Sequence, residues 1–218
     1  MISSTAQDIE TRARLLELLS NGAHQQAIEL MRALDWYDLS GVDLRRQALR
    51  RMDLAQVCLQ AARLEHALFS HSVLDRTDLR DVRADNIWLD EASLRGADLR
   101  NASLIEAFAP DACFEGADLR GAALCGAELC RADFTGANLA GADLRGVDLV
   151  GADLRDADLR GADLRTYDID VGFGVTERRG ADLQRARLQR AQFDADTRWP
   201  EGFAAHIPLW SMRFVEVS

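Results

Sequence analysis

The sequence predicts an all-β solenoid in which every group of five residues forms one side of a coil. A large apolar residue stands at every fifth position from Leu39 to Ile169, which makes 27 consecutive repeats, broken only by the small Ala84 and Ala109. Two positions before it, a second column holds alanine at 16 of these 27 sites. An internal period this regular decides the architecture of a chain before any other feature is weighed.

A period of five fits neither regular secondary structure on its own. In an α-helix each fifth residue lands about 140° further around the axis, so the leucines would cover every side. In a continuous strand five is an odd number, so successive leucines would alternate between the two faces. A change of direction once per repeat removes the conflict, because each short extended segment then sends its leucine and its alanine into one interior. Alternating large and small side chains fill such a narrow bore without voids.

These repeats resemble those of the pentapeptide-repeat proteins. The resemblance is carried by Ala-(Asp/Asn)-Leu units such as Ala137-Asn138-Leu139 and Ala152-Asp153-Leu154, and it covers about two thirds of the chain. It implies four repeats per coil, 20 residues per layer and a right-handed quadrilateral β-helix of about 30 repeats. It implies less about function, because proteins that share a fold serve different roles.

Residues 1–35 are expected to form an N-terminal helical cap ahead of a continuous β-helix over residues 36–171. Ser4 or Thr5 offers an N-cap for a first helix, and Asn21-Gly22 supplies a stop. A second helix to about residue 34 carries one apolar stripe, and a solenoid needs a cap on its open end. A DNA-reading helix pair is disfavoured, because residues 4–34, which are expected to form the two helices, have three arginines against four acids.

After Ile169 the register breaks once. The sequence predicts an inserted loop over residues 172–180, final repeats over 181–195, and a C-terminal cap or dimerisation tail over 196–218. Thr197-Arg198-Trp199-Pro200 resembles the closing sequence of many bacterial pentapeptide-repeat proteins, which implies that Trp199 folds over the last layer. Trp210 and Phe214 are too apolar for a free tail, so they either complete that cap or join two chains end to end.

Composition disfavours several classes of function. The chain has 218 residues and a net charge of −10, and it contains no apolar run near the ~18 residues of a membrane span. We expect a cytoplasmic protein. Its four cysteines lack metal-ligand spacing and are interpreted as reduced surface or edge residues, and no metal or other cofactor is expected. No histidine has a recognisable nucleophile, and a filled bore leaves no pocket of about 300 Å³, so an enzyme is not expected.

Residues 20 apart should stack on one face, which allows two ladders to be identified. An acidic ladder consists of Asp78, Asp98, Asp118 and Asp158, each followed two residues later by arginine. We expect these aspartates to accept hydrogen bonds from corner amides and the arginines to neutralise them in part, because stacked like charges repel.

A second ladder consists of Leu68, Trp88 and Phe108, with Pro110 beside it, at positions that should face outward. Three large apolar groups on one face predict a partner surface. Two alternatives stay open. An end of the chain could cover this face, or the small Ala84 and Ala109 could let a ring turn into the core.

Taken together, these features favour a non-enzymatic protein-protein interaction or scaffold protein that presents charge-laddered faces to a protein partner. A homodimer through the C-terminal end is a further hypothesis, and direct nucleic-acid or membrane partners are not expected. The alternative is bacterial antibiotic resistance by DNA mimicry: some pentapeptide-repeat proteins bind DNA gyrase, a type II topoisomerase, and protect it from inhibitors. Residues 35–171 hold 26 acids against 16 arginines, and loop residues Phe173, Arg178 and Arg179 would be contacts.

Overall fold

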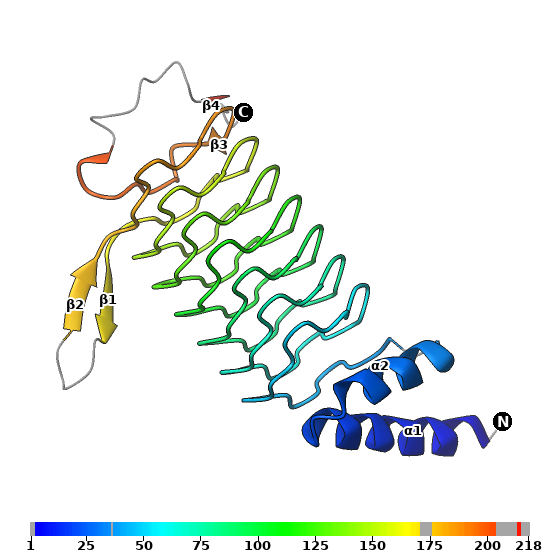
Figure 1. Ribbon diagram of the computed structural model, residues 1–218. Coiled ribbons are helices and arrows are strands. Elements are labelled where there is room, and N and C mark those ends of the chain that lie inside the picture. Colours follow the sequence, from blue (N-terminus) through cyan, green and yellow to red (C-terminus); the bar gives the residue numbers. More distant parts are fainter. Residues whose placement is uncertain (1–2, 36, 171–175, 204–212, 215–218) are drawn as a thin grey trace.

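A stack of square coils runs through most of the chain, with two helices at its N-terminal end and a hairpin near its C-terminal end (Figure 1). The computed structural model describes residues 3–35, 37–170, 176–203 and 213–214. Each repeat forms a parallel β-bridge with the repeat 20 residues later, as in the series Asp78↔Asp98↔Asp118. Four such series, displaced by five residues, form the four faces of the solenoid.

The backbone is hydrogen-bonded between layers although regular sheet is scarce. The amide of Leu99 donates to the carbonyl of Asp118 at 2.7 Å, and the amide of Asp118 donates to Ala97 at 2.9 Å. At the corner the amide of Ala102 donates to Leu99 at 3.0 Å. This pattern recurs from repeat to repeat, so the polar main chain is satisfied without long strands.

The corners require a left-handed residue. Toward the C-terminal end the corner is usually glycine, as at Gly121 (φ 67°), whereas earlier coils place side chains there, as at Arg51 (φ 58°) and His71 (φ 60°). The left-handed conformation costs an L-residue roughly 1 kcal/mol or more. The N-terminal coils therefore carry exposed polar side chains on their edges at some cost in stability.

Leucine, alanine and phenylalanine fill the bore, and the small residue Ala84 is compensated by its neighbours. Phe114 and Phe134 stack at 4.8 Å with nearly parallel rings. Around Ala84 the space is taken up by Val82 and Ile87, which replace alanine in the neighbouring inward column and are buried. The cavity that remains there is about 10 Å³. No ring is needed to fill it, and the alternative of an aromatic side chain turned inward is wrong.

Two helices precede the first coil: α1 (Ser3–Ser20) and α2 (His24–Ala33). Gly22 between them has φ 77°, and the amide of Ala23 closes the end of α1 by donating to Leu18 at 2.9 Å. The apolar sides of the helices, including Leu15, Leu19 and Ile28, are buried in one cluster with the leucines of the solenoid. Neither described helix combines the length and apolar composition that membrane crossing requires.

The insertion begins earlier than the sequence predicts. Strand β1 (Tyr167–Asp170) pairs antiparallel with β2 (Thr176–Arg179), so the backbone of Ile169 pairs with Glu177 in this hairpin and not with the neighbouring coil. The solenoid register therefore ends at Leu164 and resumes at Ala181, where Asp182 bridges to Asp148, 34 residues earlier. The continuous β-helix predicted to residue 171 and the loop predicted over 172–180 are both corrected by this pairing.

The last coil is closed by aromatic side chains. The ring of Trp199 meets Phe193 edge-on at 5.7 Å and stacks on Phe203 at 4.9 Å. Asp194 anchors the preceding turn by accepting the amides of Gly161 at 2.9 Å and Thr197 at 3.0 Å. Strand β3 (Gln192–Phe193) pairs in parallel with β4 (Arg213–Phe214).

Candidate protein-interaction surface

The apolar ladder points outward. Leu68, Trp88 and Phe108 occupy successive layers of one face through parallel bridges, and the rings of Trp88 and Phe108 contact each other at a centroid distance of 4.9 Å. The Trp88 side chain is 45% exposed, while Leu68 and Phe108 are half-buried. With this exposure, Trp88 is not covered by the helices or by the described C-terminal residues. We call the face that carries these three residues the aromatic face.

Beside the ladder lies a surface depression of about 480 Å³, lined by Trp88 and by the polar residues Arg50, Arg51, Ser70, His71 and Asp90. The Ser70 hydroxyl donates to Asp90 at 2.6 Å, and His71 Nδ1 lies 3.2 Å from a Glu91 carboxylate oxygen. Arg50 and Arg51 form no ion pair within the described part of the chain. The depression therefore combines an exposed aromatic wall with two arginines that have no carboxylate partner.

In the acidic ladder, each aspartate forms an ion pair with the arginine two residues later in the same repeat. Arg80 Nη2 lies 2.6 Å from Asp78 Oδ2, and the Arg80 amide donates to Asp78 Oδ1 at 3.2 Å. We call this unit an Asp–Arg clamp. It recurs on the same face at Asp98–Arg100, Asp118–Arg120 and Asp158–Arg160, and on the two neighbouring faces at Asp43–Arg45, Asp143–Arg145, Asp163–Arg165 and Asp153–Arg155.

The clamps shift the titration of their carboxylates. The hydrogen bond from the Arg45 side chain holds the pKa of Asp43 at about 2. The corresponding bonds from Arg80 and Arg120 lower the pKa of Asp78 and Asp118. The low pKa keeps these aspartates ionised at neutral pH, and the positive charge of the paired arginine offsets their negative charge. The acidic ladder is consequently a row of closed ion pairs and not a row of free carboxylates.

The aromatic face contains no such clamp among its described repeats. Its outward column continues past Phe108 to Glu128 and Asp148, and neither acid is followed two residues later by arginine. The aromatic face therefore carries both an exposed apolar column and two acids, Glu128 and Asp148, that have no arginine partner in their own repeats. Pro110 is half-buried at its corner, where its carbonyl accepts the amide of Glu91 at 3.0 Å.

The hairpin is seated on a corner of the solenoid by one aromatic side chain. A Cβ added to Gly126 would lie 3.3 Å from the Tyr167 ring, and Arg145 stands 5.8 Å from the ring centroid. Cys125 beneath is buried, which corrects the expectation of surface cysteines, and this burial raises the pKa of its thiol. The hairpin is braced across its strands by Arg178 and Asp168, 3.0 Å apart.

We predict that Gly146→Ala unseats this hairpin. A Cβ at Gly146 would lie 2.7 Å from Tyr167 Cβ and 2.9 Å from the Arg179 carbonyl oxygen, so Tyr167 must move. Trypsin should then cut at Arg178 and Arg179 severalfold faster. Gly136→Ala is the control, because Gly136 shares the left-handed backbone (φ 66°) but has open space beside it. Equal cleavage rates in the two variants would show that strain alone, and not the clash with Tyr167, affects the hairpin.

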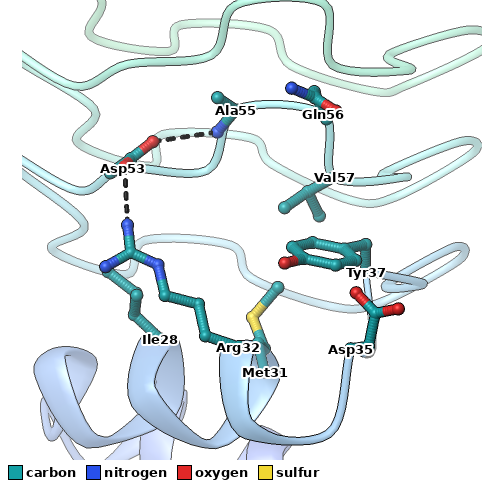
Figure 2. A pocket seen from close by; sticks show the side chains of 9 residues that line it. All are labelled: Ile28, Met31, Arg32, Asp35, Tyr37, Asp53, Ala55, Gln56 and Val57. Atoms are coloured by element: carbon teal, nitrogen blue, oxygen red, sulfur yellow. Dashed lines mark hydrogen bonds and ion pairs between the residues drawn. The ribbon is translucent and has the colours of Figure 1, made fainter.

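A cleft of about 410 Å³ lies between α2 and the first coils, and no pattern in the sequence predicts it (Figure 2). Met31 and Tyr37 point into it, and Arg32 closes one side with a 2.6 Å bond to Asp53, which also accepts the amide of Ala55. The expectation of no pocket of about 300 Å³ concerned the bore, and this cleft lies outside it, at the junction between the helices and the first coils. Arg32 is already paired with Asp53, so its charge is not available to bind an anion in the cleft.

Among the described residues, one group could bring metal ligands together: Cys113, Glu115 and Asp133, whose ligand atoms lie within 4.8 Å of one another. Glu115 is ion-paired with Arg95, and Asp133 accepts the amide of Thr135 at 2.9 Å. Two of the three groups are thus already engaged. Of the other predicted site residues, Phe173 and Trp210 lie outside the described residues, and Phe214 is placed only by its pairing in β4.

Comparison with known proteins identifies the repeats. The family model for pentapeptide repeats matches eight copies over residues 58–96, 88–121, 112–149 and 132–166. No curated protein matches the chain.

Three solved structures illustrate the similarity. HetL, a pentapeptide repeat protein involved in heterocyst differentiation regulation from the cyanobacterium Nostoc sp. strain PCC 7120, is 30% identical, with 78% of each chain covered and a TM-score of 0.37. QnrB1, a plasmid-mediated fluoroquinolone resistance protein, is 14% identical over 82% of this chain and 89% of its own, with a TM-score of 0.48. Rfr23 from the cyanobacterium Cyanothece 51142 is 22% identical over 74% and 87%, with a TM-score of 0.27.

The family match, from residue 58 to residue 166, spans half of the chain. The architecture is accordingly a right-handed β-helix solenoid. On this sequence evidence, the chain belongs to the pentapeptide-repeat family.

Proposed function

We propose that this chain is a non-enzymatic, cytoplasmic interaction protein that binds a protein partner through the aromatic face, with α1 and α2 capping the first coil and Trp199 the last. The observation that carries the proposal is the exposed Trp88, in ring contact with Phe108 on a face without Asp–Arg clamps. Large aromatic residues supply much of the energy of protein interfaces when a partner covers them. An exposed column of them marks an interaction site.

The scaffold supports this function by its rigidity. Each layer is hydrogen-bonded to the next through the backbone, and the outward residues are fixed by the buried leucine and alanine on either side. A partner that binds this face therefore orders few additional groups of the solenoid. The filled bore, with a cavity of about 10 Å³, supports a role for the surface over a role for the interior.

A quantitative capture experiment tests the proposal. Immobilised full-length chain is compared with Trp88→Ala and Phe108→Ala in extracts of the source cells. We expect specific partners to be depleted at least tenfold with either variant, because truncating an interface aromatic costs about 2 kcal/mol or more. Capture should persist as salt is raised, since apolar contacts are not screened. Val73→Ala is the matched control: Val73 holds the same repeat position on a neighbouring face and is 38% exposed.

The proposal fails if the partners captured by the wild-type chain are retained in full by Trp88→Ala and Phe108→Ala. Loss of the same partners with Val73→Ala would also contradict it, because binding would then not depend on the aromatic face.

DNA mimicry directed at DNA gyrase is the second candidate, favoured by the acidic surplus of residues 35–171 and by the hairpin arm that projects from the solenoid (Figure 1). The clamps weaken it, because they neutralise the ladder that would imitate phosphates. A supercoiling assay with purified gyrase, with and without a quinolone, separates the two. Mimicry requires an effect that weakens steeply with salt and is lost in Asp98→Asn/Asp118→Asn, whereas the aromatic face predicts no effect at micromolar protein.

A further inference from the structure

The edges of the aromatic face change charge along the solenoid axis. In each of its first four layers, two left-handed corner residues bound the face, one before the outward residue and one after it. These pairs are two arginines in the layer of Ala48, two histidines in the layer of Leu68, Asn86 and Glu91 in the layer of Trp88, and Glu106 and Asp111 in the layer of Phe108. The first layer is therefore basic at both edges, and acids begin at the layer of Trp88.

The arginines of the first layer have no partner. Arg46 and Arg51 are its corners, and Arg50 precedes Arg51. All three side chains are exposed, and none forms an ion pair within the described part of the chain. Arg50 and Arg51 line the same depression as Trp88. A free guanidinium binds carboxylates well, often through two N–H groups, so this depression offers both a carboxylate site and an apolar contact.

The acids of the next layers limit where a carboxylate of another molecule can bind. Asp90 accepts the Ser70 hydroxyl at 2.6 Å, and Asp111 accepts Arg131 Nε at 2.7 Å. Asp90 keeps its negative charge in this contact and lines the depression beside Trp88. It therefore repels a carboxylate at that layer, and the arginines attract one to the first two layers.

The carboxylate site and the apolar contact lie a short peptide apart. Two layers separate Ala48 from Trp88, which corresponds to about 10 Å at about 4.8 Å per layer. An extended peptide rises about 3.3 Å per residue, so about three residues span this distance. Because arginine side chains are long and flexible, separations of about two to four residues satisfy both contacts.

We propose that the aromatic face binds an extended segment of a partner protein in which an acidic residue lies about two to four residues from a large apolar one. The apolar side chain packs on Leu68 and Trp88, and the carboxylate binds Arg50 and Arg51. The inference rests on the proposed function, because it uses the same face and names the chemistry of the partner. Repulsion by Asp90 holds the carboxylate at the first two layers, which gives the segment one register.

A nucleic acid is the alternative occupant that combines negative charge with apolar rings. It carries a phosphate at every nucleotide, so a strand along this face would bring further phosphates beside Asp90, Glu91 and Glu106. The net charge of −10 repels a polyanion as well. A peptide with one or two acids avoids this repulsion, which favours a protein partner.

A random peptide library displayed on phage and selected on the immobilised full-length chain tests the proposal. We expect at least fivefold enrichment of peptides in which Asp or Glu lies about two to four residues from Phe, Trp or Leu. Selection on Arg50→Asp/Arg51→Glu should lose the acid, and selection on Trp88→Ala should lose the apolar residue. Folding should tolerate the charge reversal, because Asp90 and Glu91 occupy the same positions two layers later.

The most enriched peptide then serves as a labelled probe in fluorescence-anisotropy titrations. Arg50→Asp/Arg51→Glu and Trp88→Ala should each raise its dissociation constant at least tenfold. Arg76→Glu/Arg83→Glu is the matched control, because it reverses two exposed arginines off the aromatic face, and it should change the constant by less than about twofold. Salt should weaken the complex severalfold without abolishing it, since the apolar contact is not screened.

Replacing the acid of the probe by lysine should reverse the preference, so that Arg50→Asp/Arg51→Glu binds this peptide more tightly than the wild type does. Selected peptides without acid enrichment, or a dissociation constant unchanged by Arg50→Asp/Arg51→Glu, overturn the inference. They leave the proposed function standing if binding still depends on Trp88. Binding that depends on neither Trp88 nor the arginines contradicts both. A labelled single-stranded oligonucleotide that binds these arginines more tightly than the peptide overturns the inference in favour of a nucleic acid.

Discussion

Replacing Leu119 by alanine is expected to lower the free energy of unfolding by about 3 kcal/mol, within the range of 2–5 kcal/mol typical of buried leucines. Leu119 is fully buried in the middle of the solenoid, where the bore is narrow and closely packed. The backbone on each side is tied to adjacent layers, so the wall relaxes little around the cavity that the substitution creates. Urea unfolding followed by circular dichroism measures the loss.

Val73→Ala provides the comparison for this substitution. Val73 is outward and exposed, so its truncation should cost well under 1 kcal/mol. A Leu119→Ala chain that unfolds at the same urea concentration as Val73→Ala would mean that Leu119 does not line a packed core.

The second large effect is acid destabilisation through the Asp–Arg clamps. Five clamped aspartates have a folded-state pKa below the unfolded value of 3.8: the pKa of Asp43 is about 2, and the pKa values of Asp78, Asp118, Asp153 and Asp163 are lowered by their arginines. Their contribution to stability is therefore fully present above about pH 4 and is lost as the pH falls toward 2. At roughly 0.5 kcal/mol for each partly exposed pair, the clamps together contribute a few kcal/mol.

Thermal unfolding between pH 7 and pH 2 checks this expectation. The midpoint should stay level to about pH 4 and then fall steeply. In Arg80→Gln/Arg120→Gln the chain should be less stable at pH 7, and the drop below pH 4 should be smaller because the clamps of Asp78 and Asp118 are already open. An identical drop in the variant and the wild type would assign the acid sensitivity to other groups.

The solenoid could be predicted from the sequence because each repeat of five residues determines its own inward and outward side chains. One leucine and one small residue in every five specify which side chains point inward, whatever the rest of the molecule does. Ala84 shows why the leucine column alone does not predict how the core is packed. Its lost volume is restored by Val82 and Ile87 in the other inward column, so the two columns had to be read together.

The hairpin boundary was misplaced because Ile169 falls on the period of five by coincidence. The sequence did contain a contrary signal: Tyr167 stands in the inward column that alanine dominates, and it is the one aromatic residue in that column between Val42 and Tyr167. In the structure this ring packs on a corner over glycine. The cleft beside α2 carried no signal, because its existence depends on how the helices sit on the first coils, which no repeat encodes.

The outward direction of Trp88 is the observation on which the proposed function depends, and hydroxyl-radical footprinting of the dilute full-length chain tests it most directly. Peptide mapping by mass spectrometry compares Trp88, which is 45% exposed, with the buried rings of Phe114 and Phe134. We predict rapid oxidation at Trp88 and strong protection at the two phenylalanines. Protection of Trp88 equal to that of Phe114 and Phe134 would contradict the account, because the aromatic face would then not be open to a partner.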